Sequence, residues 1–243
     1  MSISGEGAMP TRLQLPRNLS VQKWKEVILE PPTIWPYLVN SLWVAFNVVA
    51  ITLLVSLPAA YVFSRRRSKV YSSLFNTILI YRMVPYISLA IPLFFLMKRY
   101  GLLGKLGGIA VSHLIRTVPL CIWLGKSFFD TIPRELEEAA WIDGVTVFGS
   151  FRRIVLPLSK SGIVVIILFS FLHSYIELLY ASIISRAGSF TLPIYFARFT
   201  TIHSTDWRAI AVSAQISLIP MVVLFVILQK YLMGGLKIGK SYE

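Results

Sequence analysis

The apolar residues of this chain gather in five long runs that are separated by shorter polar segments. The runs cover about residues 38–63, 71–97, 106–129, 161–184 and 209–230. Each run can cross the hydrocarbon core of a bilayer as an α-helix, which takes about 20 residues. Prolines inside the runs are tolerated in membrane helices, because neighbouring helices satisfy the freed carbonyl groups. The pattern therefore predicts an all-α fold, a polytopic bundle of five transmembrane helices.

The composition agrees with a membrane protein. Of the 243 residues, 56% are hydrophobic and only 14% are charged, whereas soluble domains have about a quarter charged residues. The net charge of +13 would suit nucleic acid, but the basic residues stand between the apolar runs. Cationic loops in that position meet anionic headgroups, so membrane lipid is the expected partner and nucleic acid is not. The single cysteine, Cys121, permits no intrachain disulfide and indicates no metal cluster.

The charge of the loops predicts the orientation. The first run is followed by Arg65-Arg66-Arg67-Ser68-Lys69, and the positive-inside rule places this turn in the cytoplasm. With five spans, the N-terminus then lies outside, and the loop 130–160 and the C-terminus lie in the cytoplasm. Residues 1–36 contain several prolines and no apolar core of the signal-peptide type. We expect them to form an extended or surface-lying extracytoplasmic arm ahead of a transmembrane domain at 37–243.

The loop 130–160 reads DTIPRELEEAAWIDGVTVFGSFRRIVLPLSK. Strong helix formers from Glu135 to Ile142 predict a short helix, and Gly144 is expected to end it in the left-handed conformation. Val145 to Val155 predict a second short helix. The charge pattern alone fits equally well an amphipathic element resting on the membrane and a rigid knob for a cytoplasmic partner.

The spacing within this loop favours the second interpretation. The loop contains Glu138-Ala139-Ala140, three residues, Gly144, nine residues, and Ile154-x-Leu156-Pro157. This arrangement resembles the EAA signature of permeases from binding-protein-dependent ABC importers, and every specified position is filled. The resemblance runs from about Asn18 onward and is closest to the maltose-transporter-like sugar permeases of carbohydrate uptake family 1. It also rests on segments such as YLVNSLWVAFNVVAITLLVSLPAAYVFSR and IPMVVLFVILQKYLMGGLKIGK.

Two features depart from that family. Its usual first membrane helix is missing, which leaves five spans rather than six, a complete core in related importers. In addition, Ser174-Tyr175-Ile176-Glu177-Leu178 stands in place of the common S-W-N-E-F. Contacts with substrate are therefore not carried over to this segment from the family.

The resemblance implies a transport role in which the loop 130–160 is the coupling helix that docks on an ATP-binding subunit. Glu138 would meet a basic group there, small residues would allow close approach, and Gly144 would form the elbow. The implied docking residues are Glu138, Ala139, Ala140, Asp143, Gly144, Ile154, Leu156 and Pro157. The implied partners are a second homologous permease in a heterodimer, two ATP-binding subunits and an extracytoplasmic sugar-binding protein. The chain lacks a Gly-x4-Gly-Lys-Ser/Thr loop, so ATP and Mg²⁺ are assigned to the partner ATPase. No cofactor, catalytic residue or metal is assigned to this chain.

Polar residues inside the spans are candidates for the substrate path, because ionisable groups at membrane depth usually face a bundle interior or a pathway. The candidates are Asn40, Arg82, Tyr86, His173, Tyr175, Glu177 and Gln215. His173 and Glu177 are predicted to share a helix face. An equally open alternative is that Arg82 and Glu177 form a structural ion pair between two helices.

The predicted function is that of a permease subunit in an ATP-driven sugar importer. One alternative is a permease for another solute, such as an amino acid, a peptide or an anion. The others are an ion-driven carrier that uses Arg82, Glu177 and the histidines as a relay, and a membrane scaffold without a path.

Overall fold

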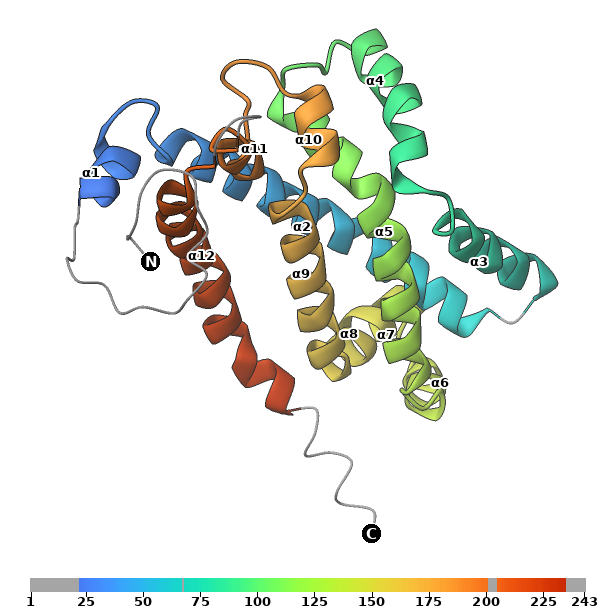
Figure 1. Ribbon diagram of the computed structural model, residues 1–243. Coiled ribbons are helices and arrows are strands. Elements are labelled where there is room, and N and C mark those ends of the chain that lie inside the picture. The colour runs from blue at the N-terminus through green and yellow to red at the C-terminus, as the bar shows by residue number, and fades with distance from the viewer. Residues whose placement is uncertain (1–21, 67, 201–204, 235–243) are drawn as a thin grey trace.

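The computed structural model of the chain is an all-α bundle and describes residues 22–66, 68–200 and 205–234 (Figure 1). Three helices are long and apolar enough to cross a membrane alone: α2 (Trp35–Arg65), α5 (Leu106–Asp130) and α12 (Trp207–Gly234). Two bent pairs of helices raise the number of spans to as many as five, if each pair is one span. The predicted fold class is therefore confirmed. Residues 1–21 of the predicted arm and Arg67 of the cationic turn lie outside the described residues.

The second predicted span is not one continuous helix. It consists of α3 (Lys69–Tyr81), the short 3₁₀-helix η1 (Tyr86–Leu89) and α4 (Ala90–Arg99), and its direction changes by 96° at the break. Pro85 accounts for the break, because it has no amide hydrogen and disfavours helical geometry at the residue before it. Arg82, predicted in mid-helix, therefore lies directly after the end of α3.

The fourth predicted span is also broken. Helix α9 (Lys160–Tyr175) ends well before residue 184, and α10 (Leu179–Ile184) begins after three non-helical residues. Because Glu177 lies in that break, the prediction that it shares a helix face with His173 is wrong. Ahead of α9 come α7 (Val147–Ser150), the π-helical turn η2 (Phe151–Val155) and α8 (Leu156–Leu158), which meet α9 at 80°.

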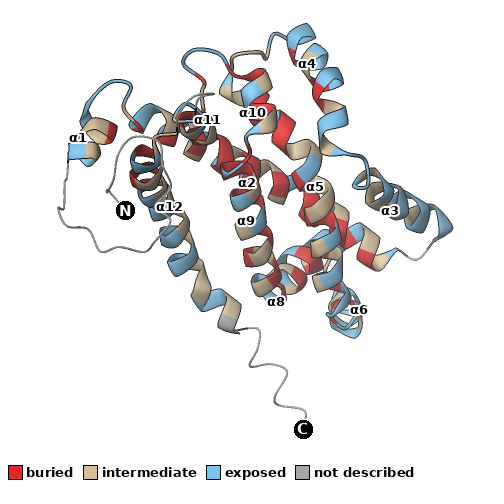
Figure 2. Cartoon of the chain, viewed as in Figure 1, coloured by how far each residue is buried: buried red, intermediate tan, exposed pale blue. Residues whose placement is uncertain are grey.

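Helix α2 is central to the packing, since it contacts both α5 and α9 along its length, while α12 packs against α9 (Figure 1). The close approach of α2 and α5 requires Gly125, because a Cβ atom there would lie 2.9 Å from the Cβ of Ala60. Buried side chains line these contacts, whereas much of α12 is exposed (Figure 2). Most of the exposed residues of α12, such as Leu218, Ile219 and Val222, are apolar, as expected of a surface that faces lipid or another membrane subunit.

Helix α1 (Gln22–Leu29) lies in the predicted arm, so that arm is not wholly extended. Its Val27 is buried, and the Lys23 ammonium lies 3.0 Å from the Asp206 carboxylate just before α12. Helix α11 (Leu192–Ala197) packs at the same end, where the Asn40 amide donates to the carbonyl oxygens of Gly188 and Phe190. The start of α2, the start of α12 and α11 therefore lie at one end of the bundle.

Candidate functional site

The predicted helix–glycine–helix elbow is present at the opposite end of the bundle. Helix α6 (Glu135–Ile142) is followed by its C-cap residue Asp143, and Gly144 has a φ of 81°, which residues other than glycine rarely adopt. The amide of Val145 donates to the Ala140 oxygen at 2.9 Å and closes the turn. Thr146 caps the next helix, α7, by accepting from the Gly149 amide at 3.1 Å. The elbow is thus held by local hydrogen bonds.

The outward face of the elbow combines two carboxylates with exposed apolar residues. Glu138 and Ala139 point outward, and so does Asp143 at the turn. The exposed apolar residues are Leu136, Trp141, Ile142, Val147 and Phe148, of which Ile142 is 87% exposed. Exposed apolar residues that gather on one turn are typical of a contact site.

Of the remaining predicted docking residues, Pro157 is exposed, whereas the other three are not. Ala140 and Ile154 are half-buried. Leu156 packs against a buried cluster formed by residues such as Tyr61 and Phe151. The EAA pattern therefore combines an outward-facing part with a part that anchors it.

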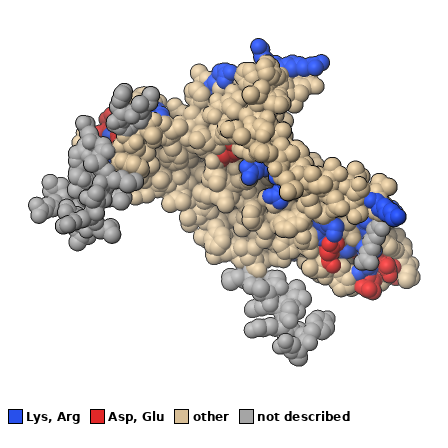
Figure 3. Space-filling model, turned by 45° about the vertical axis from the view of Figure 1, so that its right-hand side comes forward, with Lys and Arg blue, Asp and Glu red and all other residues tan. Residues whose placement is uncertain are grey.

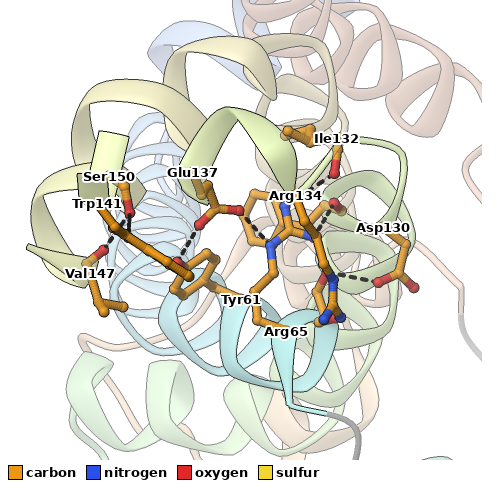
Figure 4. Close-up of polar contacts among 11 residues, drawn as sticks. Tyr61, Arg65, Asp130, Ile132, Arg134, Glu137, Trp141, Val147 and Ser150 are labelled. Carbon is orange, nitrogen blue, oxygen red and sulfur yellow. Dashed lines mark hydrogen bonds and ion pairs between the residues drawn. The ribbon is translucent and has the colours of Figure 1, made fainter. Parts of the chain in front are cut away.

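The inward face of α6 carries a buried ion pair that we did not predict from the sequence (Figure 4). The Glu137 carboxylate lies 2.6 Å from Nε of Arg65 and accepts a hydrogen bond from the Tyr61 hydroxyl. Glu137 is 1% exposed although its neighbour Glu138 is exposed. The signal in the sequence was two adjacent glutamates on a short helix, which necessarily point in different directions.

A cavity of about 460 Å³ opens beside this pair, between the last turns of α2 and the elbow. Arg66 and Arg134 line it together with Glu138 and Trp141. A partner side chain that reaches Glu138 through this cavity would therefore also contact these two guanidinium groups and the Trp141 ring.

A second polar site joins the two broken spans at Glu177. Its carboxylate lies 2.9 Å from Nε2 of His113 and accepts the Tyr86 hydroxyl. It also accepts the amides of Tyr180 at 2.9 Å and Ala181 at 3.1 Å, at the start of α10. One carboxylate thus contacts α5 and both interrupted spans.

The alternative in which Arg82 and Glu177 form an ion pair is wrong. Among the described residues, the only ion pair of Glu177 is with His113, and none involves Arg82. The break after Tyr81 ends α3 before Arg82 and changes the course of the span. Arg82 is exposed, and so is Arg116, whose guanidinium lies 4.7 Å from the centre of the Tyr86 ring. In Figure 3, a small charged group interrupts the otherwise uncharged middle of the molecule.

The other candidate path residues have varied surroundings. Tyr175 is buried, stacks on Phe171 and donates to the Ser217 oxygen at 3.2 Å. His173 is half-buried, with Nδ1 at 3.5 Å from the Thr117 hydroxyl. Gln215 is exposed on α12. No group of three His, Cys, Asp or Glu able to hold a metal ion occurs in the part of the chain that the structure describes.

The sequence matches known transport proteins over most of its length. Residues 52–237 match the family "Binding-protein-dependent transport system inner membrane component". The sulfoquinovosyl glycerol transport system permease protein SmoH of Agrobacterium fabrum is 31% identical, over 84% of this chain and 72% of the relative. The maltose/maltodextrin transport system permease protein MalG of Vibrio vulnificus is 30% identical, over 96% of this chain and 85% of the relative.

Solved structures share the fold. A bacterial ABC transporter involved in the import of the acidic polysaccharide alginate superposes with a TM-score of 0.76 at 20% identity, over 93% of this chain and 85% of that one. The MetNI methionine ABC transporter superposes with a TM-score of 0.67 at 15% identity, over 88% of this chain and 98% of that one. The family match confirms the resemblance seen in the sequence. The chain belongs to the inner membrane permease components of binding-protein-dependent ABC transporters and is not itself the ATPase.

Proposed function

We propose that this permease is a subunit of an ATP-driven sugar importer and that its elbow, α6–Gly144–α7, docks on a separate ATPase. The observation that carries the proposal is the outward face of the elbow. It combines the Glu138 carboxylate with exposed apolar residues such as Ile142 and Phe148 on a locally hydrogen-bonded turn. A second, similar permease completes the translocation path, and a binding protein delivers the sugar from outside.

The geometry supports a mechanical role for this surface. An exposed carboxylate on a short helix forms a charge-assisted hydrogen bond with an arginine of a partner. The small side chain of Ala139 beside it lets the ATPase approach closely, and the exposed apolar residues of the elbow fill a cleft on the ATPase. When ATP binding closes the ATPase pair, the docked elbow moves with it, and the bundle changes its orientation as a rigid body.

The proposal places the elbow in the cytoplasm. Arg65 and Arg66 lie at the end of α2 beside the elbow, and Lys69 begins α3, in keeping with the positive-inside rule. The C-terminus is then cytoplasmic and the N-terminus outside.

The names of relatives support a sugar as the solute. They include SmoH and MalG and the diacetylchitobiose uptake system permease protein DasC of Streptomyces coelicolor, which is 28% identical over 92% of this chain and 81% of the relative. All three names refer to carbohydrate uptake.

Charge reversal at Glu138 tests the docking. Glu138→Lys should leave the chain in the membrane but lower the amount of co-purified ATPase about tenfold, because a like charge would face the partner's basic group. Glu135→Lys is the matched control, since Glu135 is also an exposed acid of α6. Equal recruitment of the ATPase by both variants would contradict the assignment.

Stimulation of the purified complex tests the solute. We expect the binding protein to raise ATP hydrolysis when it is loaded with a sugar, and not when it is offered amino acids or peptides. Stimulation only by a non-sugar solute would replace the sugar by that solute. Uptake that needs an ion gradient and no ATP would overturn the whole proposal.

A further inference from the structure

The buried carboxylate of Glu137 ties the elbow to the last turn of α2. Glu137 lies on the face of α6 that points into the protein, and its ion-pair partner Arg65 is the last residue of α2. Tyr61, one turn earlier in α2, donates its hydroxyl to the same carboxylate. Both partners of Glu137 thus belong to one membrane helix (Figure 4).

The Arg65 guanidinium reaches further than this pair. Its Nη1 donates to the carbonyl oxygen of Phe129 at 3.1 Å, and its Nη2 donates to the oxygen of Ile132 at 3.4 Å. Phe129 is near the end of α5, and Ile132 lies in the connection that leads to α6. A single planar group therefore fixes the ends of α2 and α5 and the start of the elbow.

Two further bonds close the network. The Arg134 guanidinium donates to the carbonyl oxygen of Ser64 at 2.9 Å, and the Ser64 hydroxyl donates to the Asp130 carboxylate at 2.7 Å. The bonds therefore run in both directions between the end of α2 and the segment 130–137. This arrangement resists both sliding and rotation of α6 relative to α2.

Aromatic packing fills the space around the ion pair. The Tyr61 ring lies 4.8 Å from that of Phe151 and 6.4 Å from that of Phe129, between centroids. A carboxylate in such surroundings stays charged at low cost only while its cationic partner is in place. The pair is therefore expected to persist through a motion rather than to open and close.

We propose that the Arg65–Glu137 pair, with Tyr61, is the contact that passes movement of the elbow to α2 during transport. The inference rests on the docking role proposed for the elbow. Glu138 faces the partner, whereas Glu137, its neighbour, holds the membrane helix. Since α2 contacts α5 and α9, a displacement of its last turn moves the bundle core. Arg65, Tyr61 and Glu137 are positioning residues and touch no solute.

The test uses the complete transporter in proteoliposomes, with both permeases, the ATPase and the loaded binding protein. Three quantities are measured: the ATPase bound per permease, ATP hydrolysis, and solute uptake. We expect Glu137→Gln to bind the ATPase within twofold of the normal amount, because the docking face is unchanged. Uptake per ATP hydrolysed should fall at least tenfold, since the elbow then moves without carrying α2 along.

Two further variants keep the test independent of folding. Tyr61→Phe removes one hydroxyl and retains the ring packing, and we expect it to lower uptake per ATP about threefold. Glu135→Gln, at an exposed position of the same helix, should leave all three quantities unchanged. Normal uptake per ATP in both Glu137→Gln and Tyr61→Phe would overturn the inference.

The pattern of losses separates this inference from the docking proposal. A parallel fall in bound ATPase and uptake in Glu137→Gln would mean that Glu137 supports docking rather than transmission, and it would also refute the inference. The docking proposal itself is tested separately, because it is refuted if Glu138→Lys recruits the ATPase normally.

Discussion

Glu177→Gln is the substitution for which the structure gives the most specific expectation. The carboxylate of Glu177 has two acceptor oxygens, and each faces a backbone amide at the start of α10. Oε1 accepts from Tyr180 N at 2.9 Å, and Oε2 accepts from Ala181 N at 3.1 Å. Glutamine has the same shape, but one of its two terminal atoms is a donor. Whichever way the new amide is oriented, one backbone N–H loses its acceptor.

The magnitude follows from that single loss. A buried donor without a partner costs about 1–3 kcal/mol, and we take about 2 kcal/mol for this site. For a chain of this size, that corresponds to a fall in the unfolding temperature of about 4–8 °C. The His113 imidazole also loses its charged neighbour at 2.9 Å, so the two residues should be energetically coupled.

A double-mutant cycle identifies the partner of Glu177. We expect His113→Gln and Glu177→Gln to be non-additive by about 1 kcal/mol, which is typical of residues in direct contact. Arg82→Gln and Glu177→Gln should instead add within about 0.5 kcal/mol, because no ion pair joins them. Thermal unfolding of the purified protein in detergent measures both cycles. A larger coupling for Arg82 than for His113 would refute the arrangement at this site.

Three other outcomes follow from the described residues. Gly144→Ala should destabilise the elbow by about 1 kcal/mol, because the φ of residue 144 is 81° and lies in the left-handed region. Steric overlap does not contribute, since no atom lies within 4 Å of the added Cβ. Unchanged ATPase recruitment and uptake would contradict this. A cysteine at Glu30 should react with an impermeant reagent outside intact cells and one at Ser68 should not, and the reverse result would invert the topology. Burial alone would raise the pKa of the Asp206 carboxyl, but hydrogen bonds from the Ala209 amide and Lys23 outweigh it and hold that pKa below the usual value. The hydrogen bond to Glu26 raises the pKa of Lys23. Burial opposes this shift, and Asp206 adds to it. The contact between α1 and α12 should therefore persist between about pH 5 and 9 and weaken only as pH falls below about 3.8 or rises above about 10.5. Within that window the α1 amides should keep a constant protection factor, which is their exchange rate relative to that of an unstructured peptide at the same pH.

The elbow was the part of the site that the sequence predicted best. Its signals are local: helix formers from Glu135 to Ile142, a glycine at the turn, and a spacing that resembles a known signature. The left-handed Gly144 follows from the same signals. The Arg65–Glu137 pair was not predicted, because its two residues are 72 positions apart in the chain. Nothing in the local pattern indicates which of two adjacent glutamates points inward.

The breaks in the second and fourth spans were missed for a different reason. Each run is apolar enough on average to cross a membrane, so its mean hydropathy does not reveal where a helix stops. Pro85 was visible, but prolines also occur inside continuous helices of this chain, at Pro58 in α2 and Pro119 in α5. Whether a proline breaks a membrane helix depends on whether neighbours satisfy the freed backbone groups. That information is in the tertiary structure only.

The two breaks also change the interpretation of the charges in the membrane. Broken spans leave backbone groups that hydrocarbon does not satisfy, and Glu177 satisfies two of them at the start of α10. The Tyr180 hydroxyl in turn donates to the carbonyl oxygen of Tyr86 at 3.0 Å, on the other broken span. The hydrogen bonds of the buried Glu177 carboxylate therefore hold the two breaks together. Arg82 and Arg116 differ, because both are exposed and neither has an ion pair in the described part of the chain. The bundle therefore leaves these two guanidinium groups on its surface, whereas it encloses the Glu177 carboxylate.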